Sequence, residues 1–328
     1  MNRFNQVLGA ALAVQVVIAG GLYFGGQPPA TDQVQMALLN TEQSLINHIA
    51  IDEGDAKQTV LSKVDGKWQL PDYHQLPANQ SKVLDILNTL ETTKIGWPVA
   101  TTESSRERFE VSDEGFQKKV VLSQGDKEIQ TLFLGTSPGF RQLHIRRSGE
   151  DEVYAVKLNS YDFPSQNTNW LDKTLLQPKG DIASLKGVDF AFNKQGNDWQ
   201  LSTGEGEPIK EEIENLTSTL ARLNIQSAAE KLADQIDYEL MVKAAGDTLN
   251  YRFFKDGSDH FISRDDYSLA FKINKSDYEK ITGQTAIQLV KKIIAEEQSS
   301  IAESTQYDNT PKVTTSEPEK EVIQNENS

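Results

Sequence analysis

The residues best suited to chemistry in this chain are its four histidines and a few carboxylates and arginines near turns. Histidine acts as a general acid or base and is the commonest metal ligand. The histidines are far apart in sequence, and no His-Glu-x-x-His zinc motif joins any two of them: His48, His74, His144 and His260. We therefore expect each to be a surface or strand-face histidine.

Two acidic clusters are candidate sites. Asp256 and Asp259 lie on either side of a glycine, which weakly resembles a calcium loop but lacks its bidentate glutamate. Asp-Gly is instead a strong hairpin signal. Asp265 and Asp266 offer paired carboxylates for acid–base work, but solvated turn residues explain them better.

Motifs for phosphate chemistry are missing from the sequence, which has no phosphate-binding Gly-x-x-x-x-Gly-Lys loop and no Gly-x-Gly-x-x-Gly. One Gly-x-Ser-x-Gly string, Gly135 to Gly139, lies between two predicted strands, whereas a nucleophile turn joins a strand to a helix. We expect no catalytic residues, no cofactor and no metal. A hydrolase with an unrecognised site would need a compact cluster of carboxylate and histidine in the fold.

One basic cluster stands out in an acidic protein, formed by Arg141, His144, Arg146 and Arg147. Strand alternation would put His144 and Arg146 on one face of a strand and the apolar residues between them on the other. This face could bind an anionic partner or a lipid headgroup. A solvated sheet face is the favoured interpretation.

The composition of the chain excludes several classes of binding partner and of covalent chemistry. The chain has 328 residues, 37% of them hydrophobic, and a formal net charge of −15. Its length suits about two domains, and its charge argues against nucleic acid or broad adhesion to an anionic membrane surface. Cysteine is absent, which excludes disulfides, thiol nucleophiles and cysteine-linked lipids.

Residues 7–25 form an apolar run without a charged residue. Nineteen helical residues rise about 28 Å, close to the hydrocarbon thickness of a bilayer. Arg3 precedes the run and an acidic flank follows it, which predicts a cytoplasmic N-terminus. We expect an uncleaved signal anchor. A cleaved signal peptide is the alternative, but Pro28 lies in the cleavage position.

The rest of the chain repeats one pattern. Gly-Lys-Trp68-Gln-Leu and Asn-Asp-Trp199-Gln-Leu are each followed by a polar stretch and an amphipathic segment. Their apolar residues recur at helical spacing, which predicts helices over about 80–93 and 208–223. Alternating runs and turn residues around both predict antiparallel strands. Such a repeat indicates two copies of one structural module.

The expected architecture is α+β. Each module is an antiparallel meander sheet with one covering helix, and Trp68, Trp199 and Tyr154 are expected in the cores. The boundaries are a transmembrane helix at 1–27, a linker at 28–40, a first module at 41–178, a second, shorter module at 179–284, a C-terminal helix at 285–298 and a disordered polar tail at 299–328.

Several of these motifs resemble the DUF4340 family, a domain of unknown function. They are Lys67-Trp68-Gln69-Leu70, the helix start with Pro77, Ala78 and Val83, Leu134-Gly135, Val153 to Val156, and Trp170-Leu171-Asp172-Lys173. The resemblance covers about residues 38–283. The second copy departs from it, because no Trp-Leu-Asp-Lys follows there.

The resemblance implies a bacterial inner-membrane protein with one N-terminal anchor and a periplasmic bulk. Its relatives look to be encoded beside ABC-type transporter components. We therefore expect a non-enzymatic accessory or scaffold that contacts a permease or another envelope protein. The alternative is a small-ligand or glycan receptor that uses the cleft between the modules, which predicts exposed aromatic residues there.

Overall fold

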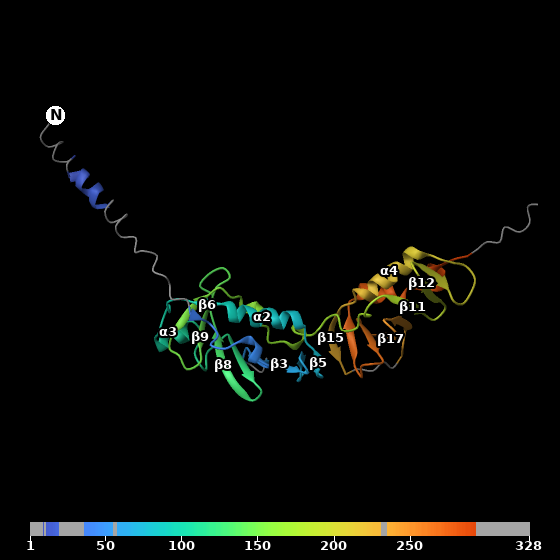
Figure 1. The fold of residues 1–328 in the computed structure, drawn as a ribbon, viewed down its shortest axis with the longest axis horizontal. Coiled ribbons are helices and arrows are strands. Elements are labelled where there is room, and N and C mark those ends of the chain that lie inside the picture. The colour runs from blue at the N-terminus through green and yellow to red at the C-terminus, as the bar shows by residue number, and fades with distance from the viewer. Residues whose placement is uncertain (1–8, 10, 20–35, 55–57, 231–234, 293–328) are drawn as a thin grey trace, which may run out of the picture.

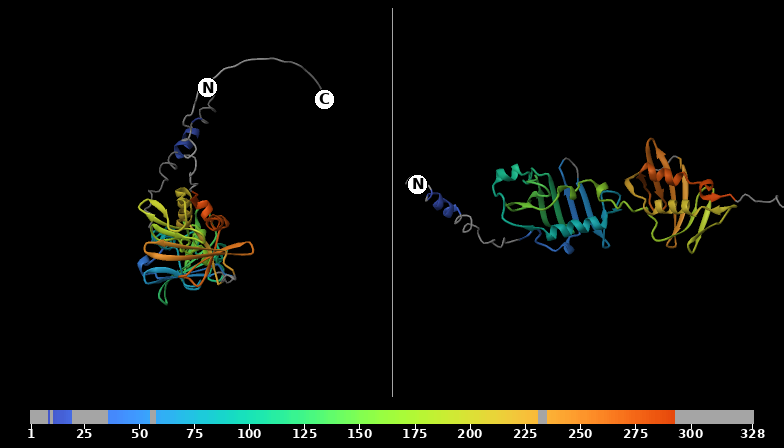
Figure 2. Two further views of the ribbon diagram at one scale, coloured as in Figure 1. Left: turned by 90° about the vertical axis from the view of Figure 1, so that its right-hand side faces the viewer. Right: turned by 90° about the horizontal axis from the view of Figure 1, so that it is seen from above.

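Alternating apolar and polar residues place most of the chain in two antiparallel β-sheets. The computed structural model describes residues 9, 11–19, 36–54, 58–230 and 235–292. The two sheets follow one another along the long axis, with helices packed on them (Figures 1 and 2). The predicted α+β class is confirmed.

The first sheet has eight strands in the order β10-β9-β8-β7-β2-β3-β4-β5. It consists of two meanders, β2 to β5 and β7 to β10, that meet where β2 pairs with β7. The strands are β2 (His48–Asp52), β3 (Gln58–Val64), β4 (Lys67–Leu70), β5 (Leu76–Pro77), β7 (Lys118–Gln124), β8 (Lys127–Leu134), β9 (Leu143–Arg147) and β10 (Val153–Val156).

The second sheet also has eight strands, in the order β13-β12-β11-β16-β17-β18-β19-β15. Read from β19 to β13, it repeats the order from β10 to β4 of the first sheet. The strands are β11 (Ile182–Lys186), β12 (Ala191–Gln195), β13 (Asp198–Leu201), β15 (Ile225–Ala229), β16 (Tyr238–Ala244), β17 (Asp247–Asp256), β18 (Asp259–Arg264) and β19 (Ala270–Ile273).

Helix α2 (Gln80–Thr92) packs its apolar side on the first sheet (Figure 1). Asn79 caps its N-terminus by accepting a hydrogen bond from the Lys82 amide at 3.0 Å. Val83, Leu87 and Leu90 are buried at helical spacing, and each contributes roughly 1.5–3 kcal/mol by burial. Helix α4 (Lys210–Ala221) has the same place in the second copy and buries residues of matching spacing.

The expectation of one covering helix is wrong for the second sheet, where α5 (Lys275–Thr282) also contacts β18 and packs beside α4, with α6 (Ala286–Leu289) after it. The structure also adds α3 (Glu103–Arg108) after α2, but α3 buries no residue. The C-terminal helix predicted over 285–298 is also wrong in length, because it ends at Leu289. The next residues form β20 (Val290–Lys291), which pairs with β14 (Glu207–Pro208) and so leaves the helical conformation.

The sequence predicts a membrane span at the N-terminal end of the chain and a polar tail at its C-terminal end. Residues 9 and 11–19 of the predicted span are described and are helical, while the rest of 7–25 lies outside the described residues. Among described helices, none has the length and apolar character needed to cross a bilayer. The predicted tail, 299–328, lies outside the described residues.

A short connector, residues 170–177, joins the two sheets. On the first sheet, the Trp170 carbonyl accepts a hydrogen bond from the Asn79 amide at 2.7 Å, and the Asp172 amide donates to Pro77 at 2.9 Å. Trp170 itself is fully buried, and its indole nitrogen donates to the Pro164 carbonyl. The connector therefore pairs with the segment that leads into α2.

The same connector is held by the second sheet. The Ile225 amide donates to the Lys173 carbonyl at 3.0 Å. Two buried side chains of the second sheet donate hydrogen bonds to carbonyls further along the connector. The Tyr251 hydroxyl donates to the Leu176 carbonyl at 2.7 Å, and the Arg264 guanidinium donates to the Leu175 carbonyl at 3.3 Å. One continuous apolar core, to which Leu171 and Leu176 belong, runs through this junction.

Removing the hydroxyl of Tyr251 tests this junction. Tyr251→Phe leaves the Leu176 carbonyl buried without its donor, so the free energy of unfolding should fall by about 1–3 kcal/mol. Urea denaturation of both variants gives the comparison. The control is Tyr161→Phe, whose exposed hydroxyl makes no hydrogen bond within the described residues. Equal stability of the two variants would contradict the role of the connector.

Candidate binding groove beside helix α2

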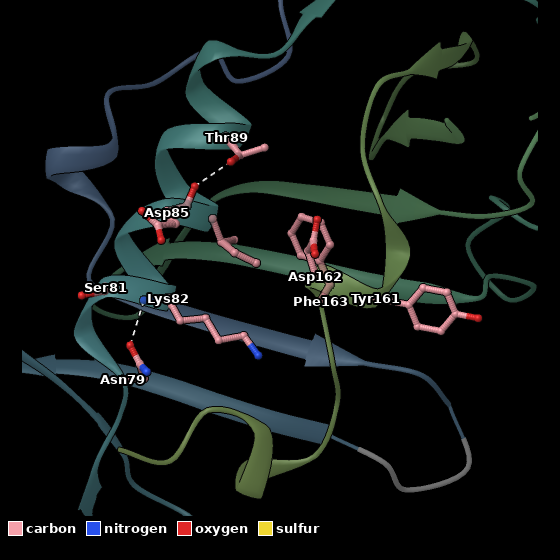
Figure 3. A pocket seen from close by; sticks show the side chains of 9 residues that line it. Asn79, Ser81, Lys82, Asp85, Thr89, Tyr161, Asp162 and Phe163 are labelled. Atoms are coloured by element: carbon pink, nitrogen blue, oxygen red, sulfur yellow. Dashed lines mark hydrogen bonds between the residues drawn. The ribbon is translucent and has the colours of Figure 1, made fainter. Parts of the chain in front are cut away.

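A hollow of about 500 Å³ lies between α2 and the 3₁₀ turn Ser160–Asp162 (Figure 3). Polar side chains of α2 form one wall, and the turn with Phe163 forms the other. The lining residues are Asn79, Ser81, Lys82, Asp85, Ile86, Thr89, Tyr161, Asp162 and Phe163. The hollow therefore combines both charge signs with an apolar floor.

Local capping fixes both walls. Asn79 caps α2 through its side chain, and its amide is held by the Trp170 carbonyl. On the other wall, the Asn159 side chain accepts a hydrogen bond from the Tyr161 amide at 3.2 Å and begins the 3₁₀ turn. This turn places Phe163 in the core and leaves Tyr161 87% exposed at the rim.

Lys82 is the half-buried cation of this hollow. Its ammonium donates to the Asn169 carbonyl at 2.9 Å and lies 4.6 Å from the centre of the Trp170 ring. Burial lowers its pKa, and the nearby Asp162 carboxylate acts in the opposite direction. The side chain extends from α2 toward the opposite wall (Figure 3). It can therefore offer a positive charge to a carboxylate-bearing ligand.

A second hollow, of about 550 Å³, continues the first and shares Thr89 and Asp162 with it. Phe140 lies at its rim and is 87% exposed, with the Arg141 guanidinium 5.1 Å from the ring centre. Lys157 lines it as well. We call the two hollows together the α2 groove. Its rim carries two exposed aromatic rings, Tyr161 and Phe140.

The structure divides the predicted basic cluster. Arg141 is exposed and lines the α2 groove. His144, Arg146 and Arg147 are buried on β9. The Arg146 side chain donates to the Val111 carbonyl at 2.6 Å, and the Arg147 side chain contacts the Glu150 carboxylate at 2.8 Å.

The predicted solvated face on β9 is therefore wrong. The segment from α3 to β7 folds over this face and forms a small second core with Val111, Phe133 and Val153. Phe109 stacks on His144 at 4.0 Å between ring centres, and Thr136 shares a 2.9 Å hydrogen bond with its Nδ1 atom. Burial is the main cause that lowers the pKa of His144.

The remaining sequence predictions fall outside the groove. Trp68, Trp199 and Tyr154 are buried, as predicted. Asp256 and Asp259 face each other across the β17–β18 hairpin. The Asp266 carboxylate is engaged by Arg264 at 2.7 Å. In the described part of the chain, no three His, Asp or Glu side chains are grouped to hold a metal ion.

The alternative cleft between the sheets is crossed by side-chain contacts. The Tyr73 hydroxyl accepts a hydrogen bond from the Ala228 amide at 2.8 Å and lies 3.2 Å from its carbonyl. His74 lies 3.3 Å from the Glu230 carboxylate. The exposed rings of Tyr161 and Phe140 lie beside α2, and that of Trp97 lies in the segment after Ile95.

Sequence reasoning missed the groove residues, although a signal exists for two of them. Phe140 follows Pro138-Gly139, and Tyr161 lies in a polar run that starts at Asn159. Turn residues of this kind break strand patterns, so a large aromatic side chain among them has no sheet face to pack on. Lys82 carried no signal, because its surroundings come from the distant connector.

Together, the fold and the groove define an α+β protein with two repeated antiparallel sheets and a candidate binding surface. A family model described as a domain of unknown function, DUF4340, matches residues 68–241, and the chain belongs to this family. The match runs from β4 into β16 and so includes parts of both sheets. No curated protein and no solved structure matches the chain.

Burial of His144 predicts a pH-dependent stability. Its folded pKa lies below the unfolded value of about 6.5, so the unfolded chain binds a proton more readily. The associated stability is present above the unfolded pKa and is lost as the pH falls through it toward the folded pKa. His144→Gln should therefore show a flatter pH dependence of the free energy of unfolding.

The measurement is urea denaturation from about pH 8 down to about pH 5, the range in which histidine changes charge. At about pH 8 residue 144 is neutral in both the wild type and the His144→Gln variant, so the difference in stability there gives the packing cost of the substitution. Parallel curves for the two proteins would contradict the assignment of His144 as a buried neutral histidine.

Proposed function

We propose that this protein is a non-enzymatic scaffold of the bacterial cell envelope that binds another envelope protein through the α2 groove. The observation that carries the proposal is the groove itself, with Tyr161 and Phe140 exposed at its rim. Large exposed aromatic side chains are costly in water, and they are enriched among the residues that dominate protein interfaces.

The charges of the groove suit a polypeptide partner. It is lined by the cations of Lys82 and Arg141 and by the carboxylates of Asp85 and Asp162. Mixed charges of this kind give register and specificity to a partner surface, while the aromatic rings give contact area. Arginine beside an aromatic ring is a combination found at interface hot spots.

The proposed partner is a membrane protein, with an ABC-type permease as the first candidate. Support for this class comes from the resemblance, which implies membrane-anchored proteins beside transporter components. It also comes from the apolar residues 7–25, which we propose as a single-pass anchor in the inner membrane with the remaining chain in the periplasm.

Site-specific photo-crosslinking tests the binding surface. A photoreactive phenylalanine analogue in place of Tyr161 should crosslink an integral membrane protein in intact cells, because this side chain projects from the rim. Adding Lys82→Glu to the same chain should weaken the crosslink by about tenfold, since the mixed charge pattern would be altered. Quantitative mass spectrometry of the crosslinked product gives the measurement.

The control places the same analogue at Val188, an exposed position in the loop between β11 and β12. An equally strong crosslink from this control would show adhesion without site specificity. A protein from Tyr161 crosslinks that is soluble rather than membrane-embedded would overturn the proposed class of partner.

Carbonate extraction tests the proposed anchor. The full chain should stay in the membrane pellet, because a spanning helix is not released by high pH. A variant without residues 1–27 should move to the supernatant. A reporter that is active only in the periplasm, fused after residue 292, should be active. Release of the full chain by carbonate would count against the anchor.

A further inference from the structure

The two sheets differ at one edge. In the second sheet, β15 follows α4 and pairs with β19 along Ile225–Ala229. In the first sheet, the counterpart β6 (Lys94–Ile95) pairs instead with β1 (Met36–Ala37). Within the described residues, one bridge, between Ala100 and Val153, joins the segment after β6 to β10. A hollow of about 550 Å³ remains between them, which we call the edge slot.

Sequence explains why the edge slot stays open. The repeat aligns Gly96-Trp97-Pro98 with Gln226-Ser227-Ala228 of β15. Proline has no amide hydrogen and a fixed backbone angle, so it interrupts a strand at this point. Trp97 turns outward and is 74% exposed. The segment after β6 therefore diverges from β10 where its counterpart completes the second sheet.

Backbone groups of β10 point into the edge slot. The Val153 amide donates to Ala100 at 2.8 Å, and its carbonyl accepts from Val99 at 2.7 Å. Residues of an antiparallel strand bond alternately to the two sides, so the amide and carbonyl of Ala155 face the same edge. Ala155 lines the slot, is exposed and has no partner there among the described residues.

The charge of the slot is positive. Lys94 and Lys157 line it, no carboxylate lines it, and neither lysine forms an ion pair within the described part of the chain. Arg141 lies in the adjoining α2 groove, which shares Gln142 and Lys157 with the slot. Because the whole chain carries a net charge of −15, this local excess of lysine favours an acidic occupant.

We propose that the edge slot binds an extended, acidic segment of a partner polypeptide, which adds to β10 as a new strand. Main-chain hydrogen bonds to Ala155 would give affinity, and Lys94 and Lys157 would select carboxylate side chains. The second sheet contains the completed form of this arrangement, with β15 in the position that the partner would take. The inference rests on the proposed scaffold function and names its mode of recognition.

The probe is a fluorescent synthetic peptide with the sequence of residues 224–230, carrying Ser227→Glu to face Lys157. Titration with the full chain in detergent, followed by fluorescence anisotropy, should show saturable binding. In the second sheet the Ala228 backbone groups meet Tyr73, so those of residues 227 and 229 face β19. N-methylation at 227 and 229 should abolish binding, and N-methylation at 226 and 228 should not.

Two protein variants complete the test. Ala155→Pro removes only the edge-facing amide, because proline is tolerated on an edge strand. Lys157→Glu reverses the charge, and the matched control Lys272→Glu changes the counterpart position, which β15 already covers. The first two variants should weaken peptide binding about tenfold or more, and the control should not. Thermal unfolding checks that each variant is folded.

Two results would overturn the edge slot as a strand-addition site. One is equal binding of the peptides methylated at 227 and 229 and at 226 and 228, and the other is no binding at about 1 mM peptide. Binding that appears only after deletion of residues 299–328 would overturn the partner and assign the slot to the chain's own segment. Tyr161 crosslinks that persist when the peptide fails would leave the scaffold function standing without this mode.

Discussion

The arrangement of the molecule depends on how the connector, residues 170–177, satisfies its backbone polar groups. A buried carbonyl without a donor costs free energy comparable to a lost hydrogen bond, and this segment passes through the core. The first sheet supplies partners at Trp170 and Asp172, and the second supplies Tyr251 and Arg264 for Leu176 and Leu175. Both sheets therefore satisfy polar groups of the same connector.

The connector also shapes the α2 groove. The carbonyl of its first residue, Trp170, accepts a hydrogen bond from the amide of Asn79, the residue that caps α2. The Trp170 ring lies beneath the Lys82 ammonium. The carbonyl that accepts from this ammonium belongs to the residue just before it, Asn169. A structural segment that holds the two sheets together thus fixes the electrostatics of a surface site. In the second copy no Trp-Leu-Asp-Lys is present, and the repeat places Glu212 where the first copy has Lys82.

Local patterns were enough to predict the α+β class, helix α2 nearly to its ends, and the buried tryptophans, because these depend on residues close in sequence. The basic residues of β9 were misplaced for a different reason. Strand alternation says which residues share a face, but whether that face meets water depends on a segment elsewhere, here the one from α3 to β7. The α2 groove needed three distant segments and so had no local pattern.

The two copies of the repeat differ most informatively at one strand edge of their sheets. An open strand edge is a hazard, because it offers unpaired amides and carbonyls to any extended chain. In the second sheet β15 pairs with β19, and the outer backbone groups of β15 meet Lys173 and Tyr73. The first sheet starts from the same order of strands and yet carries Gly96-Trp97-Pro98 where the pairing strand would run. Closing the edge would require only an ordinary strand sequence there, so the open edge of β10 follows from Gly96-Trp97-Pro98, and exposed aromatic residues and lysines lie beside it.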